Sequence, residues 1–271
     1  MREACAAVRR GGKSLGFVPT MGALHEGHLS LVRAAKKKCD VVAVSIFVNP
    51  TQFGPNEDFS KYPRPLEKDT EMLRAEGVDL LFTPSAQEMY PAGGATFVEV
   101  GGLSDRLCGK SRPGHFRGVA TVVNKLFNIV TPNAAFFGQK DAAQCAVLKR
   151  MVQDSNLPVR IVVCPIIREN DGLAMSSRNA YLLPEQRKQA LVLYRALNAV
   201  QAAYGGGEKR AATLIYAGKA VMANEPAAQL DYLEIVDSES LEHLSTARAG
   251  ALIAIAAKIG GTRLIDNILL A

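Results

Sequence analysis

The sequence of 271 residues contains no tryptophan, and its aromatic content is only 6%. Proteins that bind single-stranded nucleic acid without sequence preference stack the bases on aromatic side chains, so this composition disfavours such a surface. The net charge is +6 and is spread along the chain, with Lys36–Lys38 as the longest basic run. Such a run is typical of a solvated helix end. A polyanionic small ligand would account for part of the charge as well as a nucleic acid would, and we expect no nucleic-acid partner.

Cysteine is also scarce, and the five cysteines form no C-x-x-C pair. An odd, scattered set is typical of reduced thiols in a cytoplasmic protein. The apolar stretch at the N-terminus is too short for a signal peptide, and no apolar run reaches the length of a transmembrane helix. The sequence therefore predicts a cytoplasmic protein with no membrane partner.

Several common signatures of nucleotide binding and hydrolysis are missing. No G-x-G-x-x-G motif opens a predicted helix, so a dinucleotide site is unsupported. Gly109-Lys-Ser111 resembles the end of a Walker A motif, but Ser104 stands where that motif requires glycine. The sequence has neither an HExxH motif nor a nucleophile elbow. Its chemistry must therefore depend on other residues.

Hydrophobic residues make up 48% of the chain, which is enough for a substantial core. In the first 165 or so residues, short apolar runs typical of buried parallel strands alternate with amphipathic runs typical of helices. This alternation predicts a doubly wound parallel sheet of the α/β class. The predicted strands are 15–18, 40–48, 78–82, 134–137 and 159–164, with a peripheral strand at 96–100. The predicted helices are 2–10, 27–38, 66–76, 119–130 and 142–153.

The pattern changes near Ile166. One long helix is predicted from Pro184 to about Tyr204, and a second helix over 208–223 follows a glycine-rich turn. The chain then shows three apolar runs that predict strands near 230–237, 250–258 and 262–270. Helices followed by strands indicate a smaller α+β domain. We therefore predict two domains, 1–166 and 167–271.

The segment Pro19-Thr-Met-Gly-Ala-Leu-His-Glu-Gly-His28 joins a predicted strand to a predicted helix. Gly22 and Gly27 allow a ligand to approach the backbone closely. The N-terminus of a helix favours an anion, and two histidines three residues apart lie on one helix face. These features favour phosphate binding by His25 and His28. Two alternatives remain: the histidines could be surface or capping residues, or they could bind zinc, although no third ligand is near in sequence.

Polar and charged side chains also occupy four later loops. The carboxyl ends of parallel strands meet at one edge of a sheet, where α/β proteins bind their ligands. Each group alone could be a turn, a helix cap or a solvated loop. Together they predict one anion-binding site, and they comprise Asn49, Gln52, Arg112, His115, Arg117, Lys140, Asp141, Ser176, Ser177 and Arg178.

Five motifs in order along the chain resemble those of the pantothenate synthetase (pantoate–β-alanine ligase) family. They are 19–28, Asn49-Pro-Thr-Gln-Phe53, Arg112-Pro-Gly-His-Phe-Arg-Gly-Val119, Phe137-Gly-Gln-Lys-Asp141 and Met175-Ser-Ser-Arg-Asn179. The H-x-G-H element alone is shared with nucleotidylyltransferases and class I aminoacyl-tRNA synthetases. The resemblance implies the Rossmann-like fold of this HIGH superfamily, a C-terminal lid and a cytoplasmic homodimer.

The resemblance also implies a reaction. ATP and pantoate form pantoyl-adenylate and release pyrophosphate, and β-alanine then attacks the acyl carbon to give pantothenate and AMP. Magnesium accompanies the ATP. A nucleotidylyltransferase is the alternative enzyme, and a nucleotide- or RNA-binding module without catalysis is the alternative from another class, suggested only by the positive charge.

The resemblance assigns roles to individual residues as well. His25 and His28 would contact the ATP phosphates, and the backbone N–H of Met21 would help to hold the reacting groups. Gln52 and Gln144 would bind pantoate, with the amide of Asn49 beside them. Further residues would bind the rest of ATP: Gly138 and Asp141 at the ribose and adenosine, Lys140, Ser176, Ser177 and Arg178 at the triphosphate, and Asp69 near the magnesium ion through an indirect contact.

Two further predictions concern the surroundings of this site. Arg112 and His115 lie in a motif expected near the substrates. Pantoate carries two methyl groups, so the site needs an apolar wall, for which Phe53, Val122 and Phe137 are candidates.

Overall fold

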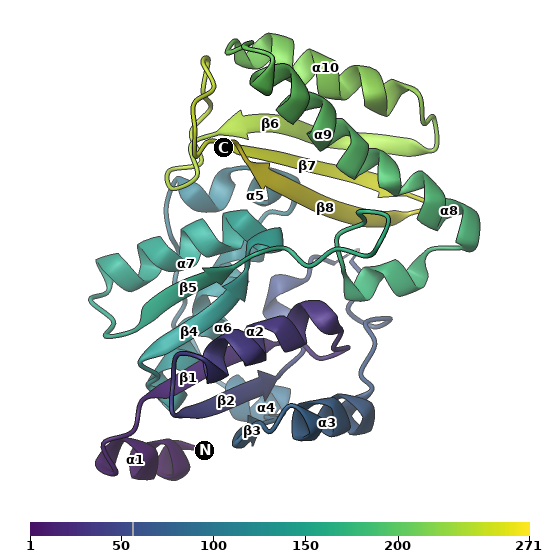
Figure 1. The fold of residues 1–271 in the computed structure, drawn as a ribbon. Coiled ribbons are helices and arrows are strands. Elements are labelled where there is room, and N and C mark those ends of the chain that lie inside the picture. Colours follow the sequence, from purple (N-terminus) through teal and green to yellow (C-terminus); the bar gives the residue numbers. More distant parts are fainter. Residues whose placement is uncertain (56) are drawn as a thin grey trace.

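The computed structural model describes residues 1–55 and 57–271. Within these residues a five-stranded parallel sheet lies below a three-stranded antiparallel sheet in the view of Figure 1. The parallel strands are β1 (Leu15–Thr20), β2 (Val41–Ile46), β3 (Leu80–Phe82), β4 (Ala134–Gly138) and β5 (Arg160–Cys164). They occur in the order β3-β2-β1-β4-β5. The predicted doubly wound parallel sheet is confirmed.

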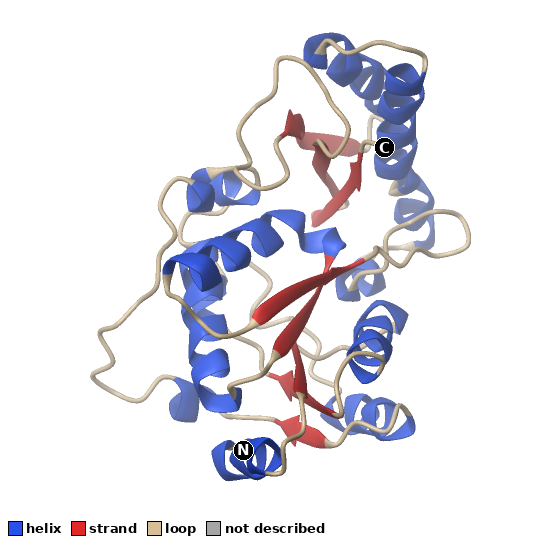
Figure 2. Ribbon diagram, turned by 60° about the vertical axis from the view of Figure 1, so that its left-hand side comes forward, coloured by secondary structure: helices blue, strands red, loops and turns tan. Residues whose placement is uncertain are grey.

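Helices cover both faces of this sheet, as Figure 2 shows. They are α1 (Arg2–Arg10), α2 (Glu26–Lys36), α3 (Leu66–Ala75), α4 (Ala86–Met89), α5 (Cys108–Ser111), α6 (His115–Val130) and α7 (Ala142–Asp154). One apolar core joins α1, α6 and α7 to the sheet face that carries Phe17 and Phe137. The other core joins α2 and α3 to the face that carries Val18 and Phe136. Successive side chains of a strand point to opposite faces, so strands covered on both sides are apolar throughout.

The strand order reverses between β1 and β4. From β1 the chain winds outward to β2 and β3, and it then returns to β4 on the other side of β1. Loops at the carboxyl ends of β1 and β4 therefore diverge and leave a crevice between them, which is where open α/β sheets bind ligands. This position contains the 19–28 segment and the turn that carries Lys140.

The second sheet consists of β6 (Ala228–Val236), β7 (Leu252–Ile259) and β8 (Thr262–Leu269). The helices α9 (Leu191–Gly205) and α10 (Ala211–Ala223) pack on one face of it and form a separate apolar core. On the other face, Val236, Leu252 and Ala254 join the core of the first sheet. The two sheets therefore share apolar contacts, and the division into domains at residue 167 stays a prediction.

Two predictions about secondary structure are wrong. Residues 96–100 form no strand; the backbone N–H of Val98 instead donates to Thr121 Oγ1 on α6 at 2.9 Å, so a helix side chain takes the place of a neighbouring strand. The predicted long helix is interrupted at Ala190, between α8 (Pro184–Gln189) and α9. Ala190 keeps helical dihedral angles, with φ −60° and ψ −22°, and it is fully buried.

Candidate active site

The loop after β1 is held in an unusual backbone conformation by one carboxylate. Gly22 and Ala23 have φ values of +79° and +50°, a region that L-residues other than Asn, Asp and His seldom adopt. Asp69 on α3 accepts hydrogen bonds from the backbone N–H groups of Ala23 and Leu24, each at 2.8 Å. A Cβ at Gly22 would lie 2.9 Å from the Asp69 carboxylate. The loop therefore requires glycine at this point, and Asp69 fixes its course.

His25 and His28 meet at the start of α2. Nδ1 of His25 accepts from the Gly27 N–H at 3.1 Å, and Nδ1 of His28 accepts from the His25 N–H at 3.3 Å. The ring centroids lie 4.1 Å apart. Burial and the charge of Lys140 lower the pKa of His25 to about 4, and burial, the proximity of His25 and the charge of Lys140 lower the pKa of His28 to about 3. Both imidazoles are therefore neutral at pH 7 and carry their proton on Nε2 as a donor.

The loop after β2 carries the side-chain amide of Gln52, which Asn49 holds in place. Asn49 is only 1% exposed, and its Nδ2 donates to Gln52 Oε1 at 3.0 Å and to the Gly118 carbonyl at 3.1 Å. Nε2 of Gln52 faces the sulfur of Met21 at 3.0 Å. A thioether is a weak acceptor, so this amide N–H is available to a better acceptor such as a carboxylate or hydroxyl. Asn49 thus orients Gln52, while Gln52 faces the cavity.

A buried basic pair lies beside this amide. Nδ1 of His115 donates to the Gln52 carbonyl at 2.9 Å, and Arg112 donates to His115 Nε2 at 2.9 Å. Burial and the charge of Arg112 lower the pKa of His115 to about 4. Arg112 itself forms a two-point ion pair with Glu57, with both N···O distances 2.6 Å. Arg117 lies apart on the surface, where its guanidinium carbon is 4.1 Å from the ring centroid of Phe97.

The third part of the site is the 3₁₀ turn η3 (Gln139–Asp141), between β4 and α7. Lys140 projects from this turn with its side chain 20% exposed, and its Nζ is 3.9 Å from the carboxylate of Asp141. Lys140 lines the same cavity as His25 and His28, and its positive charge contributes to the lowered pKa values of both rings.

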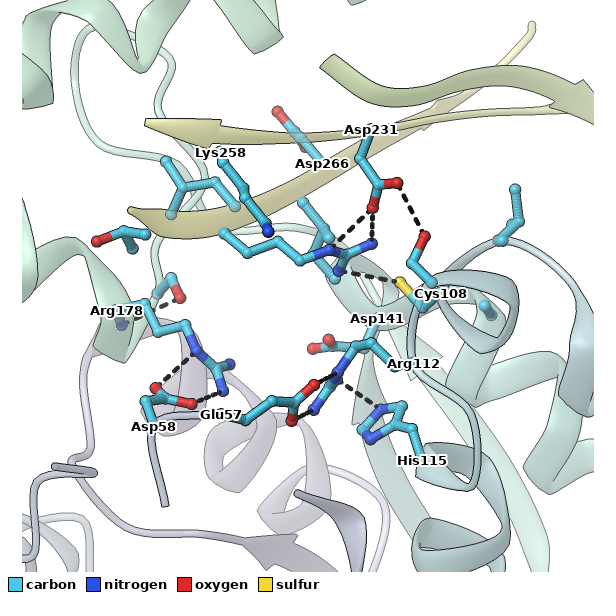
Figure 3. Close-up of a pocket in the computed structure, with 18 of the residues that line it drawn as sticks. Glu57, Asp58, Cys108, Arg112, His115, Asp141, Arg178, Asp231, Lys258 and Asp266 are labelled. Atoms are coloured by element: carbon cyan, nitrogen blue, oxygen red, sulfur yellow. Dashed lines mark hydrogen bonds and ion pairs between the residues drawn. The ribbon is translucent and has the colours of Figure 1, made fainter. Parts of the chain in front are cut away.

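The fourth part is the 3₁₀ turn η4 (Ser177–Tyr181) with Ser176 as its N-cap. The Ser176 hydroxyl accepts from the Arg178 N–H at 3.3 Å. The guanidinium of Arg178 forms two hydrogen bonds with Asp58, both 3.0 Å (Figure 3). Burial lowers the pKa of Arg178, but Asp58 outweighs this effect and the net shift is upward. Ser177 shares a 3.1 Å hydrogen bond with the hydroxyl of Tyr62.

These four parts line one cavity of about 220 Å³. It shares Gln52, Lys140 and Arg178 with a larger cleft of about 1550 Å³ next to β8. Val122 and Phe137 supply apolar surface in the cavity, whereas Phe53 lines only the larger cleft. The predicted residues gathered in the cavity are Met21, His25, His28, Asn49, Gln52, Arg112, His115, Gly138, Lys140, Asp141, Gln144, Ser176, Ser177 and Arg178.

A sequence model of one protein family, described as Pantoate-beta-alanine ligase, matches residues 1–269. The chain is 63% identical to the pantothenate synthetase of Acidobacterium capsulatum over 260 residues, which cover 96% of this chain and 87% of that protein. It is 60% identical to the pantothenate synthetase of Koribacter versatilis over 270 residues, which cover 100% and 93%.

The chain belongs to the pantoate-β-alanine ligase family. The family resemblance of the five motifs is thereby confirmed. The fold agrees as well. The crystal structure of pantothenate synthetase from Thermus thermophilus superposes with a TM-score of 0.94 at 50% identity, covering 98% of this chain and 97% of that one. The Francisella tularensis ligase, complexed with Beta-gamma ATP and Beta-alanine, gives a TM-score of 0.79 at 37% identity, covering 98% and 95%.

Asp69, like Arg117 and Phe53, is a predicted residue that lies outside the cavity lining. It is 1% exposed, and both of its carboxylate oxygens accept loop N–H groups. A carboxylate at this depth, outside the cavity lining, does not fit direct ligation of a metal ion in the cavity. Within residues 1–55 and 57–271, no cluster of three or more His, Cys, Asp or Glu side chains could hold a metal.

The acidic partners of the two cavity arginines did not follow from the sequence. Glu57 and Asp58 lie in the loop 54–64, which sequence patterns mark only as irregular. An acidic pair in a loop is ordinarily solvated, and no local signal reveals a guanidinium group far along the chain. Asn267, which contacts the Lys140 turn from the second sheet, carries no local signal in the sequence either.

Proposed function

We propose that this member of the pantoate-β-alanine ligase family condenses pantoate with β-alanine, using ATP and releasing AMP and pyrophosphate. The observation that carries the proposal is the convergence of three kinds of group in one cavity. A pair of neutral N–H donors, a supported amide and a set of cations line the same space. The amide suits the carboxylic acid, the cations suit the triphosphate, and the neutral N–H donors suit the adenylyl group that is transferred.

In the first half-reaction a carboxylate oxygen of pantoate attacks the α-phosphorus of ATP, and pyrophosphate leaves. Nε2–H of His25 and of His28 donates to phosphate oxygens as negative charge develops on them. Lys140 and Arg178 interact with the departing phosphates. A carboxylate needs no deprotonation, so catalysis rests on position and charge. The lowered pKa values of the histidines agree with this role, because neutral imidazoles donate without repelling the neighbouring Lys140.

Pantoate is held by Gln52 and Gln144, with its methyl groups against Val122 and Phe137. The backbone carbonyl of Gln52 is fixed by His115, and its side-chain amide oxygen is fixed by Asn49. In the second half-reaction the amine of β-alanine attacks the acyl carbon of pantoyl-adenylate. The acyl–phosphate bond then breaks, AMP leaves, and the amine loses a proton. Met21 lines the same cavity, and its backbone N–H helps to hold the reacting groups in this proposal.

The finer features of the function belong to the same proposal. Residues 1–166 bind ATP and pantoate, and residues 167–271 act as a lid that carries the Ser176–Arg178 loop. Magnesium binds as the ATP complex, with Asp69 acting on it only through the loop that it anchors. All five cysteines, which lie in the described part of the chain, are free thiols, which suits the cytoplasm. Across the described residues, no helix has both the length and the apolar character to cross a membrane.

We also propose a homodimer. The segment 96–100 has the alternating sequence of a strand but no ladder partner among the described residues, and it exposes 52% of Phe97. A second copy of this chain could pair with it. Sedimentation velocity should give a species of about twice 29.1 kDa, and Phe97→Asp should shift it to the monomer. A wild-type protein that sediments as a monomer at micromolar concentration would refute the dimer.

The test of the function is the exchange of labelled pyrophosphate into ATP. Wild-type protein should catalyse exchange only when pantoate is present, and addition of β-alanine should produce pantothenate and AMP in equal amounts. Formation of ADP, or exchange that does not depend on pantoate, would refute the proposal. A stable nucleotidylated product would indicate a nucleotidylyltransferase instead.

A further inference from the structure

The turn that carries Lys140 is held by a residue of the second sheet. Asn267 on β8 is 3% exposed. Its Nδ2 donates to the carbonyl oxygens of both Gln139 and Lys140, each at 2.9 Å. The side-chain amide of Gln139 donates back to Asn267 Oδ1 at 3.4 Å. A primary amide has two N–H protons, so one side chain can satisfy both carbonyls of this short turn.

The preceding residue of the same strand holds the other phosphate-facing loop. Asp266, labelled in Figure 3, is 4% exposed and forms two hydrogen bonds with Arg168, at 2.6 and 3.0 Å. Arg168 donates to the Gly172 carbonyl at 3.0 Å and pairs with Ala174 in an isolated β-bridge. This turn leads directly into Ser176. Two consecutive residues of β8 therefore contact both the Lys140 turn and the base of the Ser176–Arg178 loop.

We propose that Asn267 is a positioning residue for the adenylation step, which fixes the Lys140 ammonium group relative to the Ser176–Arg178 loop. The inference rests on the proposed function, because it takes Lys140 to contact the ATP phosphates. The Asn267 N–H is itself fixed by Asp266 Oδ1 at 2.7 Å, and its carbonyl accepts from Arg168 at 3.3 Å. The anchor therefore has a fixed backbone and a buried side chain, as a precise catalytic geometry needs.

The alternative is that Asn267 only fills space and satisfies its own polar groups. The two roles predict opposite rankings for the loss of activity in two variants, Asn267→Asp and Asn267→Ala. Asn267→Asp keeps the size of the side chain but places carboxylate oxygens against two carbonyl oxygens, and a carboxylate cannot donate. If the donated hydrogen bonds matter, Asn267→Asp is more harmful than Asn267→Ala. If volume matters, Asn267→Ala is more harmful.

The experiment measures kcat and the KM values for ATP and for pantoate in pantoate-dependent pyrophosphate exchange, with thermal unfolding as a check on folding. Asn267→Asp should lower kcat by at least about tenfold, since a misplacement of about 1 Å can cost about a hundredfold, and KM for pantoate should change less than about twofold. In a Lys140→Ala background the same substitution should change kcat by less than about twofold, because coupled residues are not additive. Asn128→Asp, on the exposed face of α6, is the matched control and should leave exchange unchanged.

Wild-type kcat in Asn267→Asp would overturn this inference and leave the proposed function intact. Full additivity with Lys140→Ala would also overturn it, because a general loss of stability acts whether or not Lys140 is present. If Asn267→Asp does not fold, the cycle of Asn267→Ala with Lys140→Ala decides by the same criterion. A wild-type protein without pantoate-dependent exchange would overturn the proposed function and this inference with it.

Discussion

Asp58 and the phosphates of ATP compete for the same arginine in the proposed mechanism. Asp58 accepts two hydrogen bonds from Arg178 at 3.0 Å, and Glu57 holds Arg112 in the same two-point arrangement (Figure 3). Tyr62 adds a hydrogen bond to Ser177. A phosphate group can bind Arg178 at the same position only when Asp58 moves away. We therefore predict that Asp58→Asn strengthens the binding of ATP.

The magnitude follows from the exposure of the pair. The side chains of Arg178 and Asp58 are 26% and 23% exposed, so solvent screens their attraction in part. An ion pair of this kind contributes about 1 kcal/mol, which corresponds to roughly a fivefold change in a dissociation constant. Asn keeps the shape of Asp58 but removes its charge. The Kd for ATP should therefore fall about fivefold.

Isothermal titration calorimetry with ATP, in the absence of pantoate, measures this change without turnover. AMP lacks the β- and γ-phosphates, so its Kd should change less than about twofold in the same variant. The matched control is Asp154→Asn on α7. It likewise removes a carboxylate from an arginine, because Asp154 lies 3.6 Å from Arg150 in a solvent-exposed ion pair. Weaker binding of ATP to Asp58→Asn would refute the reasoning, because Asp58 would then orient Arg178 for the phosphate. An equal gain for AMP would refute it as well.

Three further predictions concern rate and stability. His28→Ala and Lys140→Ala should each lower the exchange rate at least about tenfold, the effect of about 1.4 kcal/mol in the transition state, while the exposed control Lys149→Ala stays at the wild-type rate. The cavity histidines have pKa values of about 3 to 4 against 6.5 when unfolded. The unfolded state therefore takes up more protons below pH 6.5. Urea unfolding should show a loss of about 5 kcal/mol between pH 6.5 and 5.0, to which each histidine contributes about 1.6 kcal/mol, and the loss should be smaller in His28→Gln. Phe136→Ala, at a fully buried site, should cost about 3–5 kcal/mol in chemical denaturation, whereas Tyr216→Ala, at a position 74% exposed, should cost less than about 0.5 kcal/mol.

The parallel sheet and its loops followed from short-range patterns in the sequence. An apolar run such as 40–48 can be a covered strand because every second side chain faces each side of the sheet. Gly22 and His25 mark a strand-to-helix junction through local backbone requirements. Because the carboxyl ends of parallel strands share one edge, residues far apart such as Gln52 and Lys140 could be assigned to one site without coordinates.

Contacts between distant segments could not be predicted in this way. Residues 96–100 alternate between apolar and polar side chains as a strand would. A strand, however, needs a neighbouring strand to pair with, and here the Val98 N–H donates to the hydroxyl of Thr121 on α6 instead. The interruption at Ala190 has a similar origin, because it is set by packing in the core of the second sheet and not by a helix-breaking residue.

The family, the parallel sheet and the grouping of loop residues at its edge could all be predicted from local features of the sequence. Motifs and hydrophobic periodicity are read over short stretches, and the carboxyl ends of parallel strands meet at one edge. The tertiary structure alone decided how those residues are held and charged. It showed two neutral histidines, Arg178 bound to Asp58, and Lys140 on a turn anchored by Asn267. The burial of a side chain and its hydrogen-bond partners depend on which distant segments of the chain come together in space. Short-range patterns along the chain do not reveal those contacts.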